Sequence, residues 1–211
     1  LNPLQAVGEL AKKYGKVFLV DCISSMAGDE IDFTCIDLAV GTANKCLQGV
    51  PGVSFVLLRK KDLARLIKIP ARTLYFNLTG YHKAQETGGL LFTPAIPAHY
   101  ALDVALDELI EETVAGRIKR YGDAANFLRD GFKNLGLEFL IPEGWRSNCL
   151  TGLKLPKGIN YEKLHAELKS KGFVIYAGQG NLSESIFRIA NMGDIKQEEL
   201  QRLLKVLETV C

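Results

Sequence analysis

The chain has 211 residues, of which 47% are hydrophobic and 24% charged, and its formal net charge is +2 at pH 7. This composition is typical of a globular α/β protein, and the charge is too small to indicate a nucleic acid or an anionic membrane as a partner. No apolar run approaches the roughly 20 residues that cross a bilayer. No signal segment is recognised at the start, so we expect a cytoplasmic protein.

Cysteine usage indicates a reducing compartment. The five cysteines are odd in number, and no two of them have CxxC spacing. They fit free or buried thiols better than a disulfide framework or a zinc site. The three histidines form no metal-binding or catalytic-triad pattern. We therefore expect no metal.

Hydrophobic periodicity predicts helices and strands in the first half of the chain. A helical face over residues 4–11 ends at Tyr14-Gly15. Three short, continuous apolar runs predict parallel strands that are buried on both faces. These runs cover residues 17–21, 36–41 and 53–58. A short helix is expected at 60–67, and a long loop without periodicity at 70–93.

One long helical region, residues 99–135 with a bend near Gly116, is predicted to lead into the second half. Strands and helices follow it in short elements. Strands are expected at residues 137–140, 149–155, 173–176 and 185–189, and helices at 161–171 and 196–210. The whole pattern predicts an α/β protein with two domains, residues 1–108 and a smaller α+β domain of residues 109–211.

Two residues carry the chemistry that the sequence suggests. The apolar run at 17–20 ends on Asp21, and the next apolar run leads into Lys45, which lies among small residues. A pyridoxal phosphate enzyme needs such a pair. Its acid keeps the pyridine nitrogen protonated, and its lysine forms a Schiff base and later moves protons. The alternative is a surface aspartate and a surface lysine that fall near turns, since both types are commonly exposed.

The segment around Lys45 adds a resemblance. Residues 43–52, Ala-Asn-Lys-Cys-Leu-Gln-Gly-Val-Pro-Gly, closely resemble the lysine segment of the 2-aminoethylphosphonate–pyruvate aminotransferases, which are class V, fold-type I enzymes. Other stretches resemble that family in the same order, at residues 21–28, 92–95 and 187–194. The resemblance implies pyridoxal 5'-phosphate as cofactor. Residues 1–108 would be the C-terminal part of the cofactor-binding large domain, and residues 109–211 the small C-terminal domain.

The resemblance also implies a role for each of five residues. Lys45 would be the catalytic lysine that holds the cofactor, and Asp21 would pair with the pyridine nitrogen. Ser24 would lie near the cofactor's phenolic oxygen. Thr93 would donate to the cofactor phosphate of a second subunit, which makes the enzyme a homodimer. Arg188 would bind the acidic group of the substrate, because a planar guanidinium suits a carboxylate or phosphonate.

Each of these positions also has a structural alternative. Asp21 could simply end a strand, and Ser24 could belong to a turn. Thr93 could cap a helix ahead of Pro94. Arg188 could be a surface residue on an edge strand.

The implied reaction moves the amino group of 2-aminoethylphosphonate to pyruvate, giving phosphonoacetaldehyde and alanine. Another class V aminotransferase, of the alanine–glyoxylate or phosphonoalanine type, stays open because Gly41-Thr42 and Ala190 depart from the family's pattern. A cysteine desulfurase would carry a histidine where Asn44 precedes the lysine. The last alternative is an inactive piece, since the family's N-terminal phosphate-binding turn and ring-stacking aromatic are not recognised here. We expect these residues alone to bind the cofactor weakly.

Overall fold

The computed structural model describes residues 1–210, which divide into two compact units. Of the described residues, the N-terminal unit contains 3–23 and 31–108, and the C-terminal unit contains 1–2, 24–30 and 109–210. The longest segments of the two units meet between Glu108 and Leu109. The short segment 24–30, however, belongs with the C-terminal unit, and the sequence gives no sign of this.

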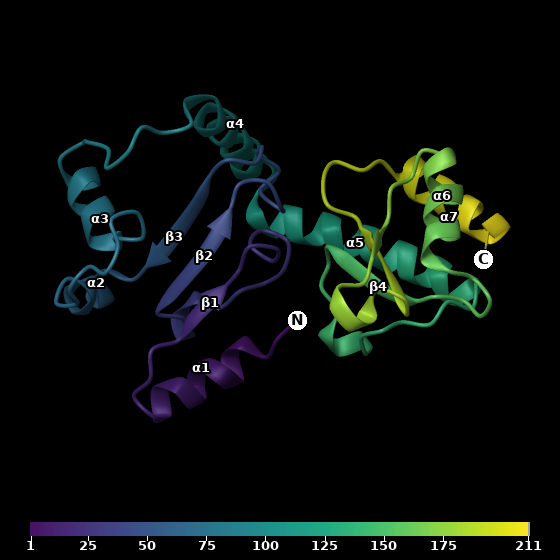
Figure 1. Ribbon diagram of the computed structural model, residues 1–211, viewed down its shortest axis with the longest axis horizontal. Coiled ribbons are helices and arrows are strands. Elements are labelled where there is room, and N and C mark those ends of the chain that lie inside the picture. Colours follow the sequence, from purple (N-terminus) through teal and green to yellow (C-terminus); the bar gives the residue numbers. More distant parts are fainter. Residues whose placement is uncertain (211) are drawn as a thin grey trace. The chain divides into compact units, whose positions relative to one another are not determined.

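The N-terminal unit is built on a three-stranded sheet with the order β1-β2-β3 (Figure 1). Its strands are β1 (Leu19–Asp21), β2 (Leu38–Thr42) and β3 (Ser54–Leu58). β1 runs parallel to β2, but β3 is antiparallel to β2, so the prediction of three parallel strands is wrong for β3. The reason is the connection. Residues 43–53 form a turn rather than a crossover helix, and a direct turn can only join antiparallel neighbours.

Burial in this sheet also differs from the prediction. Val20 and Ala39 are buried, whereas Val56 and Leu57 of β3 are exposed. Among the described residues, β1 and β3 each pair with one neighbour only. The sheet is therefore not buried on both faces within these residues.

Helices of the N-terminal unit follow the predicted pattern with one exception. The predicted helices are confirmed as α1 (Leu4–Lys13) and α2 (Lys60–Leu66). The exception is α3 (Leu78–Glu86), which lies inside the region expected to be a loop. Its start is capped by Asn77, whose side-chain oxygen accepts a hydrogen bond from the Gly80 N–H at 3.0 Å. Figure 1 shows α2 and α3 beyond the carboxyl end of β3.

The long helical region is broken into α4 (Ile96–Glu112) and α5 (Val114–Asn134). The break lies at Thr113, three positions before the predicted bend. Thr113 has a left-handed φ of 68°, and its hydroxyl caps α5 by accepting a hydrogen bond from the Gly116 N–H at 3.0 Å. A β-branched residue with positive φ is strained, so the cap and its surroundings must hold the break in place.

The end of α4 is tied to the start of α5 by an ion-pair cluster. Arg120 donates to Glu112 from Nε at 2.6 Å and from Nη2 at 3.1 Å, and the buried Arg117 donates to the same carboxylate. These hydrogen bonds, that of Arg120 foremost, lower the pKa of Glu112 to about 2. Arg120 also donates to the Gly193 carbonyl at 2.8 Å, which links the break to the loop after the last strand.

The C-terminal unit is an antiparallel sheet packed against helices. The sheet has the order β4-β6-β5, with β4 at Leu150–Lys154, β5 at Tyr176–Ala177 and β6 at Ile186–Ala190. Helices α5, α6 (Tyr161–Ser170) and α7 (Gln197–Val210) supply most of the remaining core. Side chains at 0–1% exposure fill its centre; they are Phe132, Leu153, Leu164, Leu168, Phe187 and Leu207.

Most predicted elements of this unit are confirmed, and two differ. The strand expected at 173–176 is displaced to β5, which shares only Tyr176 with the predicted range. The strand expected at 137–140 is only an isolated bridge between Phe139 and Leu153. Three short 3-10 helices complete the two units: η1 (Phe33–Cys35), η2 (Glu143–Trp145) and η3 (Gly180–Leu182). Over residues 1–210, none of the helices combines the length and apolar character that a membrane crossing requires.

Candidate active site

Asp21 is the last residue of β1 and is exposed. In the parallel pair it lies opposite Val40, and the next N–H, that of Cys22, donates to the Val40 carbonyl at 3.0 Å. One carboxylate oxygen accepts a hydrogen bond from the Ile23 N–H at 2.9 Å. The second oxygen engages none of the described residues. Asp21 therefore presents an acceptor at the carboxyl end of the strand.

Lys45 lies in the turn that follows β2. Its neighbours Ala43 and Cys46 are fully buried, while Lys45 itself is half-buried. The Gly49 N–H donates to the Ala43 carbonyl at 2.8 Å, and the Gln48 N–H donates to the Lys45 carbonyl at 2.9 Å. These bonds fix the backbone of the turn. The Lys45 amine has no hydrogen-bond or ion-pair partner within residues 1–210, so it is available to a ligand.

The turn tolerates little change in its backbone. Gln48 has a φ of 65°, in the left-handed region. A Cβ placed on Gly49 would lie 3.2 Å from both the Cβ and the carbonyl oxygen of Ala43, which is tighter than ordinary contact. Glycine at position 49 therefore lets the chain close back on Ala43, and this closure sets the direction of the Lys45 backbone.

The parallel pairing brings Asp21 and Lys45 to the same edge of the sheet. Both residues follow the carboxyl end of a strand, and parallel strands have their carboxyl ends together. In open α/β sheets, ligands bind beyond that edge. An available amine and a carboxylate acceptor at this edge fit pyridoxal phosphate, which offers a carbonyl to an amine and a protonatable nitrogen to an acid.

Thr93 belongs to the same unit and is exposed in the segment before α4. Its hydroxyl makes no hydrogen bond to the described residues. The first turn of α4 is closed instead by the Ala95 carbonyl, which accepts the N–H groups of Ala98 at 3.0 Å and His99 at 3.1 Å. The alternative role of Thr93 as a helix cap is thus not seen, and its hydroxyl remains accessible.

Ser24 lies in the segment 24–30 of the C-terminal unit and is exposed. The segment turns where the Ser25 carbonyl accepts hydrogen bonds from Gly28 N at 2.9 Å and Asp29 N at 2.8 Å. Ala27 has a φ of 63° within this turn. Ser24 is therefore part of a tight turn, as its structural alternative proposes, and a role toward the cofactor is compatible with its exposure.

Arg188 lies on β6, the central strand of the second sheet, between Gly152 of β4 and Tyr176 of β5. The alternative reading of an edge-strand arginine is therefore wrong. Its Nε donates to the Ala177 carbonyl at 2.8 Å, and its two Nη groups bond to none of the described residues. Its partner on β4, Gly152, has no side chain, and a Cβ placed there would lie 3.6 Å from Leu140.

A cavity of about 210 Å³ lies in the C-terminal unit, next to Gly152 and Arg188 of the sheet. Arg146 also lines it. Arg146 is held by a hydrogen bond from its Nε to the Ile141 carbonyl at 2.8 Å, and its guanidinium stacks on the Phe139 ring at 3.9 Å. Trp145 forms another part of the wall. Two arginines among otherwise mostly apolar lining residues are compatible with an anionic ligand. Arg146 has no local sequence signal that distinguishes it from a surface arginine.

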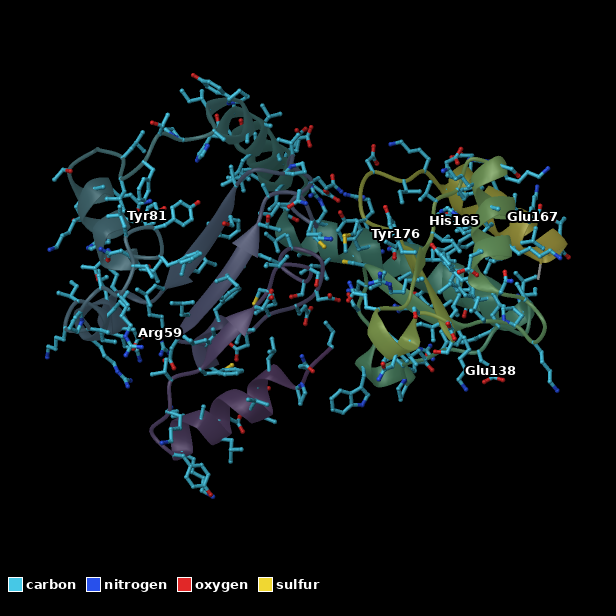
Figure 2. All side chains as sticks on the ribbon, in the orientation of Figure 1. Arg59, Tyr81, Glu138, His165, Glu167 and Tyr176 are labelled. Carbon is cyan, nitrogen blue, oxygen red and sulfur yellow. The ribbon has the colours of Figure 1, made fainter. Side chains whose placement is uncertain are left out.

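His165 and Cys22 are two further side chains of a reactive type. His165 on α6 stacks beside Tyr161, with ring centroids 5.5 Å apart, and Figure 2 shows it on that helix in the C-terminal unit. Cys22 is fully buried, and burial, with the charge of Asp21, raises the pKa of its thiol. No group of three or more His, Cys, Asp or Glu side chains within residues 1–210 has the arrangement of a metal site.

Comparison with known proteins adds the family. A family model described as aminotransferase class-V matches residues 1–201. The chain is 38% identical, over 97% of its length, to a 2-aminoethylphosphonate–pyruvate transaminase of Syntrophobacter fumaroxidans, and 37% identical, over 98%, to one of Bacteroides fragilis. It spans 57% and 58% of these two relatives. The curated relatives therefore contain substantially more chain than these residues.

Solved structures agree with the fold. The chain superposes on a ureidoglycine–glyoxylate aminotransferase from Bacillus subtilis with a TM-score of 0.91 and 27% identity, covering 100% of this chain and 56% of that one. It superposes on an alanine–glyoxylate aminotransferase from Nostoc with a TM-score of 0.89 and 26% identity, covering 99% and 57%. These likenesses confirm the predicted fold class, part of a fold-type I transferase.

Proposed function

The chain belongs to the aminotransferase class-V family, and from that premise we propose that the protein transfers the amino group of 2-aminoethylphosphonate to pyruvate. The products are phosphonoacetaldehyde and alanine. Pyridoxal phosphate is the cofactor of this family. One observation carries the proposal, which is the shared position of Asp21 and Lys45 at the carboxyl edge of the β1–β2 pair. The named relatives support the choice of donor and acceptor.

Lys45 and Asp21 have different roles at the carboxyl edge of the β1–β2 pair. When bound, pyridoxal phosphate supplies a ring that accepts electrons from the donor carbon. Lys45 would hold the cofactor through Nζ, and its amine would take the proton from the donor carbon. Asp21 accepts a hydrogen bond from the pyridine nitrogen and so keeps a proton there. Its hydrogen bond from the Ile23 N–H fixes the direction of the carboxylate.

Arg188 recognises the acidic group of the substrate. Because Nε is already bonded to the Ala177 carbonyl, the guanidinium plane is oriented and its two Nη groups remain for the ligand. Arg146 lines the same cavity and adds a second positive charge. Two cations suit a phosphonate, which can carry two negative charges, better than a single carboxylate. This supports 2-aminoethylphosphonate as the donor.

Two further roles complete the proposal. Ser24 donates to the cofactor's phenolic oxygen, and Thr93 donates to the cofactor phosphate of a second subunit, so that the enzyme works as a homodimer. The exposure of both residues and the unbonded hydroxyl of Thr93 support these roles. We also propose that the enzyme acts in the cytoplasm.

A second candidate is a class V aminotransferase with another donor, of the alanine–glyoxylate or phosphonoalanine type. The likeness to the alanine–glyoxylate aminotransferase from Nostoc favours this candidate. Such an enzyme would use the same Lys45 and Asp21, so the donor alone separates the two. A catalytically inactive piece is the remaining alternative, because these residues span only 57% of the relatives' length.

The test begins with the cofactor. The complete protein is incubated with pyridoxal phosphate, reduced with borohydride and digested, and the modified lysine is located by mass spectrometry. We expect a pyridoxyl group on Lys45 and its loss in Lys45→Ala, with Lys60→Ala as a surface control. A panel of amines then identifies the donor. Modification of another lysine, or none, would overturn the assignment, and a preference for alanine over 2-aminoethylphosphonate would favour the second candidate.

A further inference from the structure

A buried carboxylate with no role in the proposed chemistry lies eight positions after Asp21. Asp29 is 4% exposed and accepts two hydrogen bonds at 2.7 Å, one from the Ser147 hydroxyl and one from the Asn148 N–H. Asn148 also donates from its side chain to the Gly28 carbonyl at 3.1 Å. We call Gly28, Asp29, Ser147 and Asn148 the Asp29 latch. It joins segment 24–30 to a loop more than a hundred positions later.

The loop side of the latch is itself fixed by the core of the C-terminal unit. Arg129, which is buried, donates to the Ser147 carbonyl and, from Nε, to the Thr151 hydroxyl at 3.3 Å. Asn191 donates to the Asn148 carbonyl at 2.8 Å. Burial lowers the pKa of Arg129, and the negative charge of Asp29 opposes that shift. The partners of Asp29 are therefore held by residues outside the latch as well.

The segment on the other side of the latch is strained. Ala27 has a φ of 63°, a conformation that residues with a Cβ avoid. Strain of this kind persists only when the surroundings over-determine the backbone. Here the surroundings are the latch at Asp29 and the turn closed on the Ser25 carbonyl. Without the latch, we expect Ala27 to relax and Ser24 to move with it.

We propose that Asp29 is a positioning residue for the cofactor site, acting through the latch on Ser24 and on the Asp21 carboxylate. The inference rests on the proposed function of Asp21 and Ser24 as cofactor partners. Only Cys22 and Ile23 separate those two residues, and the Ile23 N–H is the group that orients the Asp21 carboxylate. A change in the path of segment 24–30 is therefore transmitted by the chain to the acceptor of the pyridine nitrogen.

The alternative is that Asp29 only stabilises the fold, and three variants of the holoenzyme separate the two. Asp29→Ala removes both accepted hydrogen bonds. Asp29→Asn keeps the shape and can still accept from the Asn148 N–H while donating to the Ser147 hydroxyl. Tyr161→Phe is the matched control, because it removes one hydrogen bond of the same unit, from its hydroxyl to the Ile175 carbonyl at 2.9 Å, away from the segment.

The measurements are the pyridoxal phosphate dissociation constant, the pH dependence of the bound cofactor's absorbance, kcat and the donor KM, together with Tm. For Asp29→Ala we expect the dissociation constant to rise about tenfold and kcat to fall by a similar factor, since small misplacements of a catalytic group are costly. The donor KM stays near that of the parent protein, because Arg188 is unchanged. In Asp29→Asn, the dissociation constant and kcat return most of the way to the values of the parent protein. Tyr161→Phe lowers Tm without changing cofactor binding.

Two results would overturn the inference, and they differ. If the parent protein does not hold pyridoxal phosphate on Lys45, the proposed function fails and the inference fails with it. If the parent protein binds it and Asp29→Ala lowers Tm but leaves the dissociation constant and the absorbance unchanged, the inference alone fails. Should Asp29→Ala not fold, Ser147→Ala removes one of the two hydrogen bonds, and the same readouts apply with a smaller expected change.

Discussion

The side chains proposed to do the chemistry are oriented by hydrogen bonds that leave their reactive atoms available. One carboxylate oxygen of Asp21 accepts a hydrogen bond from the Ile23 N–H, and the other engages none of the described residues. Arg188 donates from Nε to the Ala177 carbonyl, and its two Nη groups bond to none of the described residues. Within residues 1–210, Lys45 is held through its backbone alone, in a turn that closes between Ala43 and Gly49. Orientation of this kind reduces the freedom that a ligand would otherwise have to restrict.

The recognition role of Arg188 leads to a prediction for Arg188→Lys. Lysine keeps the charge but loses the planar pair of donors, so we expect the loss of one hydrogen bond to a charged group, about 1.5–3 kcal/mol. This corresponds to a rise of roughly tenfold to a hundredfold in KM for 2-aminoethylphosphonate. Steady-state kinetics measure it. Arg202→Lys, at an exposed arginine of α7 paired with Glu199, should leave KM unchanged; an equal KM in Arg188→Lys would exclude the proposed contact.

The break between α4 and α5 is the feature of the secondary structure that the local sequence pattern explains least. Thr113 combines a positive φ with a capping hydroxyl, two features that usually belong to different residues, glycine and threonine. The ion-pair cluster of Glu112 with Arg117 and Arg120 then fixes the two helix ends. The break thus depends on contacts that resist continuation of a single helix.

Substitutions at Thr113 should separate the cap from the strain. Thr113→Ala removes the cap and keeps a Cβ at positive φ, so we expect the free energy of unfolding to fall by about 1 kcal/mol. Thr113→Gly also removes the hydroxyl but relieves the backbone, and a glycine cap costs only a few tenths of a kcal/mol. Urea denaturation of both variants measures the difference. Equal losses would mean that the threonine backbone is not strained.

The Glu112 cluster gives a prediction for pH. Hydrogen bonds from Arg120 and Arg117 lower the pKa of the Glu112 carboxyl group from 4.5 to about 2. A carboxylate whose pKa is lower in the folded state stabilises the fold above its unfolded pKa, and this contribution is lost as pH falls through the folded value. We therefore expect stability to drop between about pH 4.5 and pH 2. In Glu112→Gln this part of the drop should be absent when Tm is measured against pH, and an unchanged profile would contradict the assignment.

At the scale of the whole molecule, much apolar surface of the N-terminal unit is exposed. Ile96, Tyr100 and Val104 lie one turn apart along α4 and are 54%, 70% and 58% exposed. The sheet edges at β1 and β3 have no strand partner among the described residues. Unpaired edges and apolar faces promote association between copies. The curated relatives, of which these residues span 57% and 58%, contain further chain.

The α/β class, most helices and strands, and the segment that holds Lys45 could be predicted from the sequence alone. Hydrophobic periodicity and a ten-residue segment are local properties, and local properties can be read without the fold. The tertiary structure decided the antiparallel direction of β3, the central position of Arg188 and the break at Thr113. It also decided the partners of Asp29, which lie 118 and 119 positions away in the chain. Contacts between such distant residues exist only once the chain is folded, so no local pattern could indicate them.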